Sequence, residues 1–171
     1  MSVDAREAIE RLRGVLGHPF RRPEALVDAL THRSYVNEAD GRVIDNERLE
    51  FLGDAVVSLI VATELMQRYP EAREGALSRL RASLVDEAAL TALAVKLDMG
   101  DALLLGRGED LSGGRQRASI LADAFEAVMA AVYLDGGLEA ASRVLLPRLT
   151  FPEPSAIPRG DPKTALQERL Q

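Results

Sequence analysis

The sequence predicts an all-α protein, and three observations support this fold class. The 171 residues are long enough for one domain with a substantial core, and 47% of them are hydrophobic, as in globular chains. Only 4% are aromatic, so alanine, leucine and valine must fill the core, which favours closely packed helices. Apolar residues recur at helical spacing in several segments that glycine and proline separate.

The first two elements are predicted from apolar spacing and helix breakers. Residues 3–16 form an amphipathic helix that Gly17 and Pro19 interrupt, with Ala8, Ile9, Leu12 and Leu16 as its apolar stripe. Pro23 favours the start of a second, short helix that continues to Leu30. His32 follows this helix, and a lone histidine near a helix end is more often structural than a ligand.

Residues 46–69 predict a long helix after a polar loop at 37–45, and Pro70 ends it. Asn46 or Asp45 is the expected N-cap. One face is expected in the core; it carries Leu49, Leu52, Val56, Leu59 and Ile60. Phe51 lies beside the acids and apart from this face, where an apolar ring is unusual for a solvated surface and could be a peripheral core contact.

The remaining elements follow from helix starts and breaks. Glu74 and Asp86 open two further helices, the second reaching about Leu97, and a short apolar piece closed by glycines occupies residues 100–108. A glycine-rich loop then leads into a helix over residues 119–137, and a last helix spans residues 138–149.

Three carboxylates share one face of the helix over residues 46–69. At about 100° per residue, Glu47, Glu50 and Asp54 fall within roughly 60° of one another, and no lysine or arginine lies on that face. Unpaired oxygen ligands suit a hard cation such as Mg²⁺ or Mn²⁺. The alternative is that this face is simply the solvated side of an amphipathic helix.

A second acidic pair lies on the helix over residues 119–137. Asp123 and Glu126 share one face, together with the small residues Ala127 and Ala130, which would allow another helix to approach closely. The opposite face is apolar. The sequence therefore predicts that two helices face each other across a metal ion, each contributing a pair of carboxylates.

Several blocks resemble the ribonuclease III family, the endonucleases that cut double-stranded RNA. The segment NERLEFLGDAVV, residues 46–57, is similar to that family's signature. Four further blocks resemble the family in the same order: LTHRSYVNE, REGALSRLRASLV, LLLGRGE and GGRQRASILADAFEAVMAAVYLDGG. The similarity covers roughly residues 30–149 and is most like the bacterial members.

The resemblance implies a fold, a reaction and a set of roles. The expected fold is the all-α ribonuclease III endonuclease domain in a two-fold symmetric homodimer, with Phe51 at the dimer interface. Glu50, Asp54, Asp123 and Glu126 would be the catalytic, metal-binding residues, with Mg²⁺ (Mn²⁺ possible) as cofactor, and Glu47 and Glu74 would be supporting acids. Expected products carry 5′ phosphates and short 3′ overhangs. The expected setting is cytoplasmic processing of rRNA, mRNA and tRNA.

Three arginines in and around the glycine-rich loop, Arg107, Arg115 and Arg117, are candidates to grip the RNA backbone. The alternative is an ordinary solvated loop. A net charge of −6 speaks against tight RNA binding without metal ions. LSGGRQR resembles a motif of ABC-type ATPases, but the chain has no Gly-Lys pair for a phosphate-cradling loop, so no nucleotide cofactor is expected.

The composition divides the chain into three parts. Residues 1–150 are the expected endonuclease domain, residues 151–160 a proline-rich linker, and residues 161–171 the start of a double-stranded-RNA-binding domain. No apolar signal core or membrane-length apolar run is found, so no membrane association is expected. There is no cysteine, which excludes disulfides and thiolate metal sites.

The sequence argues against three competing functions. A non-catalytic scaffold that binds structured RNA with the same fold would be indicated by loss of an acid, and none is lost. A di-iron carboxylate bundle needs paired Glu-x-x-His motifs, but Val15 and Ala29 stand where His18 and His32 would require glutamate. A generic helical interaction module does not explain several ordered blocks.

Overall fold

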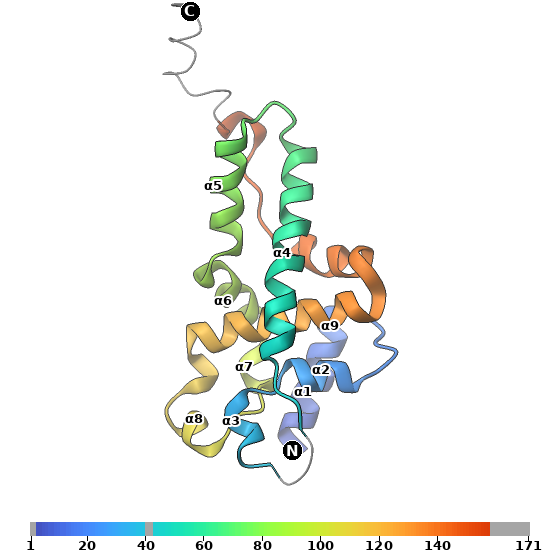
Figure 1. Ribbon diagram of the computed structural model, residues 1–171, viewed down its shortest axis with the longest axis vertical. Coiled ribbons are helices and arrows are strands. Elements are labelled where there is room, and N and C mark those ends of the chain that lie inside the picture. The colour runs from blue at the N-terminus through green and yellow to red at the C-terminus, as the bar shows by residue number, and fades with distance from the viewer. Residues whose placement is uncertain (1–2, 40–42, 158–171) are drawn as a thin grey trace, which may run out of the picture.

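Two long helices cross at the centre of the molecule. In the computed structural model, which describes residues 3–39 and 43–157, α4 runs along the long axis and α9 crosses it (Figure 1). The contact between α4 and α9 is the most extensive of those between elements in the described part of the chain. The helices are α1 (Val3–Leu16), α2 (Glu24–Ala29), α3 (Arg33–Val36), α4 (Glu47–Arg68), α5 (Glu74–Val85), α6 (Glu87–Lys96), α7 (Met99–Ala102), α8 (Arg107–Leu111) and α9 (Ala118–Leu145), with 3₁₀ turns η1 (Gly114–Gln116), η2 (Leu146–Arg148) and η3 (Pro154–Ala156).

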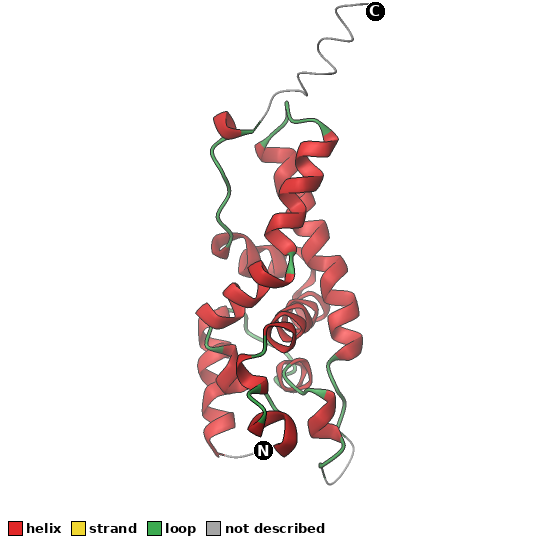
Figure 2. Cartoon of the chain, turned by 90° about the vertical axis from the view of Figure 1, so that its left-hand side faces the viewer, coloured by secondary structure: helices red, strands yellow, loops and turns green. Residues whose placement is uncertain are grey.

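The all-α prediction is confirmed. Figure 2 shows helices joined by loops, with no strand in the part of the chain that is drawn in colour. Within that part, the only extended pairing is an isolated parallel bridge between Thr31 and Leu104. The predicted helix over residues 3–16 matches α1, and the predicted starts at Glu74 and Asp86 match α5 and the N-cap of α6.

Helix α9 is the centre of the core because it is apolar on nearly all sides. Phe125, Val128, Met129 and Val132 are fully buried, as predicted, and so are Ala127 and Ala130. α4, α6 and α2 surround it. The expected break at residues 136–137 is present as a kink: Gly137 has φ 76° and ψ −178°, in the left-handed half of the map that favours glycine, and the helix then continues to Leu145.

The buried face of α4 is rotated from the one predicted. Gly53, Val57 and Ile60 lie along its centre, and Leu59 is 52% exposed. The prediction that Leu59 belongs to the core is therefore wrong. The physical reason is that α9 contacts the Gly53 side of α4, so a residue about 120° from Gly53 falls outside the contact.

The start of α4 distinguishes between the two expected capping residues, Asn46 and Asp45. Asn46 precedes the helix, but its side-chain amide donates to the carbonyl of Ala29 (3.2 Å) and does not cap. Asp45 Oδ1 accepts from the N–H of Glu47 instead (3.3 Å). Asn46 is buried and its own N–H donates to the carbonyl of Thr31 (2.9 Å). This residue therefore joins the start of α4 to the end of α2, and so fixes the acidic end of α4 in place.

The first part of the expected linker packs against the far end of α4. Tyr69 donates its hydroxyl proton to the carbonyl of Pro152 (2.6 Å), and the Arg68 guanidinium lies 4.5 Å from the centre of the Phe151 ring. Ile157 also packs against the core. Residues 161–171, the expected start of an RNA-binding domain, lie outside the described residues. No helix in the described ranges is both long and apolar enough to cross a membrane.

Candidate metal centre

The structure brings together three of the four predicted catalytic acids. Glu50 comes from the first turn of α4, and Asp123 and Glu126 come from α9. One carboxylate oxygen of each lies within 4.8 Å of the others, and all three side chains are half-buried. Two segments more than 70 residues apart in the sequence thus converge on one point, as the acidic pairs on facing helices predicted.

Gly53 makes this convergence possible. A Cβ built on Gly53 would lie 1.9 Å from the backbone carbonyl oxygen of Glu126, so only glycine lets α4 approach α9 this closely. Sequence reasoning attributed the close approach to Ala127 and Ala130 and missed Gly53. The sequence does contain a signal for this contact. Glycine in the middle of a long helix costs stability relative to alanine, so its presence there indicates a close approach of another segment.

The three carboxyl groups oppose one another's ionisation. Burial, and then the charges of Asp54, Asp123 and Glu50, raise the pKa of Glu126 to about 7. Burial and the nearby Glu87 raise the pKa of Asp123, while His32 acts in the opposite direction. Burial, Asp123 and Glu47 raise the pKa of Glu50. The group is therefore a concentrated negative site that is only partly ionised near neutral pH.

Asp54, the fourth predicted acid, lies one turn further along α4. It is exposed and is not one of the three whose oxygens lie within 4.8 Å, but its charge reaches Glu126. Glu87 opens α6 and was not singled out from the sequence. Its charge acts on Asp123, so α6 also contributes to the negative field.

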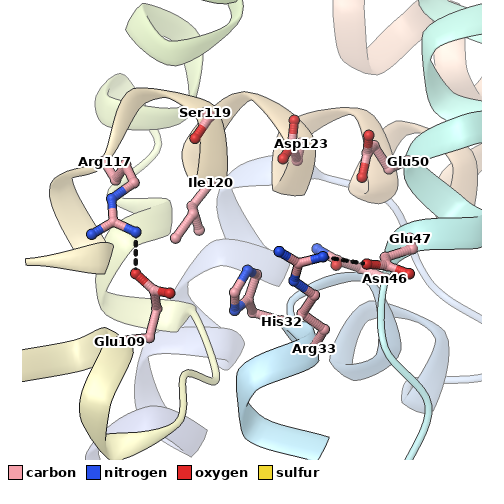
Figure 3. A pocket seen from close by; sticks show the side chains of 10 residues that line it. All are labelled: His32, Arg33, Asn46, Glu47, Glu50, Glu109, Arg117, Ser119, Ile120 and Asp123. Carbon is pink, nitrogen blue, oxygen red and sulfur yellow. Dashed lines mark hydrogen bonds and ion pairs between the residues drawn. The ribbon is translucent and has the colours of Figure 1, made fainter. Parts of the chain in front are cut away.

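A cavity of about 450 Å³ opens beside the acids (Figure 3). In this view the carboxylates of Asp123 and Glu50 stand next to each other on one side, and His32 and Arg33 lie on the other. The cavity is lined by His32, Arg33, Asn46, Glu47, Glu50, Glu109, Arg117, Ser119, Ile120 and Asp123. Acidic groups and hydrogen-bond donors thus face a common space large enough for a phosphate group.

The predicted supporting acids lie in different places. Glu47 lines the cavity and forms an ion pair with Arg33 (3.4 Å). Glu74 opens α5, where its carboxylate accepts from the Ser78 hydroxyl (2.6 Å), and it lines a separate groove with Met66. Because Met66 is 16 residues beyond Glu50 on the same helix, Glu74 lies roughly 24 Å along α4 from the acids of its own chain.

The three candidate arginines have three different environments. Arg117 lines the cavity and is paired with Glu109 and the Ser112 hydroxyl. Arg107 begins α8 with an exposed side chain and is not among the residues that line the cavity.

Arg115 serves the fold instead. Its guanidinium binds Asp110 and donates to the carbonyls of Gly100 and Leu103 (both 2.9 Å) and of Asp101 (3.3 Å). The prediction that Arg115 grips RNA is at odds with this placement, because its donors are already used to cap α7 and join it to α8.

The acidic group fits a hard divalent cation. Carboxylate oxygens are the ligands that Mg²⁺ and Mn²⁺ prefer. Among the described residues, no ion pair links Glu50, Asp123 or Glu126 to a basic side chain. A bound cation would offset both causes that raise these pKa values, burial of the carboxyl groups and repulsion from neighbouring acids.

Comparison with known sequences identifies close relatives. A family model described as Ribonuclease-III-like matches residues 22–151. A protein called "Ribonuclease 3" from Geobacter metallireducens is 49% identical over 171 residues, covering 96% of this chain and 69% of that protein. The protein of the same name from Pseudomonas syringae pv. syringae is 50% identical over 167 residues, covering 96% of this chain and 70% of its own length.

Solved structures support the same relationship. The nuclease domain of ribonuclease III from Campylobacter jejuni, described as flexible in a region involved in dimer formation, superposes with a TM-score of 0.76 at 40% identity. The superposition covers 82% of this chain and 94% of that one. Dicer from Giardia intestinalis shares the fold, with a TM-score of 0.64 at 24% identity over 89% of this chain and 21% of its own.

Proposed function

Because the chain belongs to the ribonuclease III family of endonucleases, we propose that it hydrolyses phosphodiester bonds of double-stranded RNA in a reaction that depends on divalent metal ions. The observation that carries this proposal is the convergence of Glu50, Asp123 and Glu126 beside a cavity lined by both acidic and cationic side chains. In A-form RNA the deep groove hides the base edges, so recognition would depend on shape, phosphate and 2′-hydroxyl groups.

Glu50, Asp54, Asp123 and Glu126 would hold Mg²⁺, with Mn²⁺ as the other candidate. Divalent ions bound there would lower the pKa of a water molecule and stabilise charge on the attacking and leaving oxygens. The Glu126 carboxyl, with its pKa near 7, loses its proton readily when a cation approaches. Arg33 and Arg117 line the same cavity, paired with Glu47 and Glu109, and supply the positive charge on its wall that RNA phosphates would meet.

We further propose a homodimer whose two metal centres each cut one strand, giving 5′ phosphates and short 3′ overhangs. Phe51 is 84% exposed on α4, as a residue reserved for a subunit interface would be. Processing of rRNA, mRNA and tRNA in the cytoplasm is the proposed setting. We also propose that residues 1–150 form an endonuclease domain, residues 151–160 a linker and residues 161–171 the start of an RNA-binding domain.

The test is incubation with a long RNA duplex, with and without Mg²⁺, followed by sizing of the products and analysis of their ends. We expect short duplexes with 5′ phosphates only in the presence of Mg²⁺. Glu126→Gln is expected to abolish cleavage while leaving folding and self-association intact, since the change preserves shape and removes the charge. Wild-type protein that binds the duplex but never cuts it would favour the non-catalytic scaffold instead.

A further inference from the structure

Two backbone hydrogen bonds with Leu104 fix the position of His32. Its N–H donates to the carbonyl of Leu104 (3.0 Å), and the N–H of Leu104 donates to the carbonyl of Leu30 (2.9 Å). These bonds make up the short bridge between the end of α2 and the segment after α7. The ring of His32 consequently projects from a fixed point, and it lines the cavity that holds Glu50 and Asp123 (Figure 3).

One ring nitrogen of His32 is committed to the fold. Nδ1 accepts from the N–H of Ser34 (3.3 Å), which caps α3, and lies 2.8 Å from the Ser34 hydroxyl oxygen. That oxygen accepts from the N–H of Gly106 (2.9 Å), and because Nδ1 already acts as an acceptor, the hydroxyl is assigned as the donor to Nδ1. Because Nδ1 accepts from the Ser34 N–H, the ring N–H is assigned to Nε2.

The second ring nitrogen has no protein acceptor in the described part of the chain. The two arginines of the cavity each form an ion pair, Arg33 with Glu47 and Arg117 with Glu109. The Nε2–H group of His32 is thus a donor that is fixed in direction and is bonded to no acid among the described residues. Such a group suits an anionic ligand that lies beside the carboxylates, because a phosphate oxygen is a strong acceptor for an N–H that no protein group already uses.

We propose that His32 Nε2–H donates a hydrogen bond to a non-bridging phosphate oxygen of the RNA strand in this cavity. His32 is then a substrate-binding residue as well as the cap of α3. The proposal rests on the proposed function, because it takes RNA as the ligand. It extends the prediction that this histidine is structural: Nδ1 is structural, and Nε2 faces the substrate.

Two substitutions separate the two ring nitrogens. His32→Asn keeps an acceptor near Nδ1, and asparagine is a good N-cap, but it removes the distal donor. His32→Gln places an amide N–H near the position of Nε2 but loses the short acceptor that caps α3. A purely structural histidine would be replaced better by asparagine, and a phosphate-binding histidine better by glutamine.

The experiment measures kcat and KM for cleavage of a short RNA duplex in Mg²⁺, together with the Tm of each variant. We expect His32→Asn to raise KM by about tenfold with a Tm near that of the wild type, the usual effect of losing one hydrogen bond to a charged group. We expect His32→Gln to keep KM within about threefold despite a lower Tm. Binding of the same duplex is measured in a Glu126→Gln background to confirm that the change in KM reflects affinity.

The outcomes distinguish this proposal from the proposed function. Equal effects of the two variants on KM, or a better rescue by asparagine, would overturn the role of Nε2 while leaving cleavage by the wild type intact. A wild-type protein that neither binds nor cleaves the duplex would overturn both.

Discussion

Glu126 illustrates how one residue links the site to the stability of the fold. Its carboxyl has a pKa of about 7, against an ordinary value of 4.5, because it is buried among Asp54, Asp123 and Glu50. At pH values between 4.5 and about 7, Glu126 is protonated to a greater extent in the folded protein than in the unfolded chain. The free energy of unfolding must then fall as pH rises through this window, and the loss is complete above about 7.

We predict that, in a chelator, Tm decreases from pH 5 to pH 8, and that Mg²⁺ raises Tm more at pH 8 than at pH 5. Glu50 and Asp123 have pKa values raised in the same direction and add to the slope. The measurement is thermal unfolding with and without Mg²⁺ across this range. In Glu126→Gln the slope should be shallower; an unchanged slope would show that Glu126 is not its main source.

Arg115 and Arg117 stand two residues apart but are expected to act differently. Arg115→Ala leaves the carbonyls of Gly100 and Leu103 without their donor, so we predict a loss of about 1–3 kcal/mol in stability with little effect on KM. Arg117→Ala removes a cation from the cavity wall, so we predict a higher KM for RNA and a nearly unchanged Tm. Denaturant unfolding and cleavage kinetics measure both, and a reversed pattern would refute the assignment.

At the scale of elements, the contact between α4 and α9 sets the geometry of the centre. Gly53→Ala would place a methyl group against the carbonyl of Glu126, forcing the helices apart. We predict destabilisation by about 1–3 kcal/mol or more, together with weaker binding of Mg²⁺, because the acids on α4 and α9 would separate.

Gly75→Ala is the matched control for this prediction. Gly75 lies in α5, where an added Cβ would make only an ordinary contact, 3.5 Å from Arg79. Alanine there should be neutral or stabilise by up to about 1 kcal/mol through helix propensity. Denaturant unfolding and Mg²⁺ titration of both variants make the comparison, and equal stability of the two would remove the special role of Gly53.

The same contact shows which features of the fold could be predicted from the sequence. The bounds of α1 and the starts of α5 and α6 follow local rules of apolar spacing, helix breakers and capping, and these predictions held. The exposure of Leu59 depends on which side of α4 meets α9. Local periodicity defines the direction of an apolar face only to within about 100°, the angle between successive residues of a helix. The pattern therefore placed Leu59 in the core.

The site divides in the same way. The acidic pairs on α4 and α9 were found because carboxylates at helical spacing are a local pattern, and the structure brings Glu50, Asp123 and Glu126 together. The position of Glu74 and the partners of Arg115 depend on how distant segments pack. The two roles of His32 required its hydrogen-bond partners, which come from α3 and from Gly106.

At the scale of the whole molecule, α4 carries an apolar face that the single chain does not cover. Phe51 is 84%, Leu59 52% and Met66 68% exposed, and they lie within roughly 80° of one another around the helix. The three side chains are spread over about 22 Å of helix on one side of α4, and exposed apolar side chains that gather on one face in this way commonly mark an interaction surface. The face lies next to the acids at one end of α4, so a partner seated on it would set the spacing between two metal centres.

We predict that Phe51→Ala weakens self-association by at least about tenfold, because a large exposed aromatic at a subunit interface commonly dominates its binding energy. The fold should be retained, since Phe51 makes little use of the core of its own chain. Leu111→Ala is the control, because Leu111 is 90% exposed on α8, away from this face. Sedimentation across a range of protein concentrations measures both variants. If the dimer forms as proposed, protein diluted below the dissociation constant of the dimer should cut duplex RNA poorly. Phe51→Ala should lose cleavage at a higher protein concentration than the wild type does. Unaltered assembly and cleavage by Phe51→Ala would exclude this face as the interface.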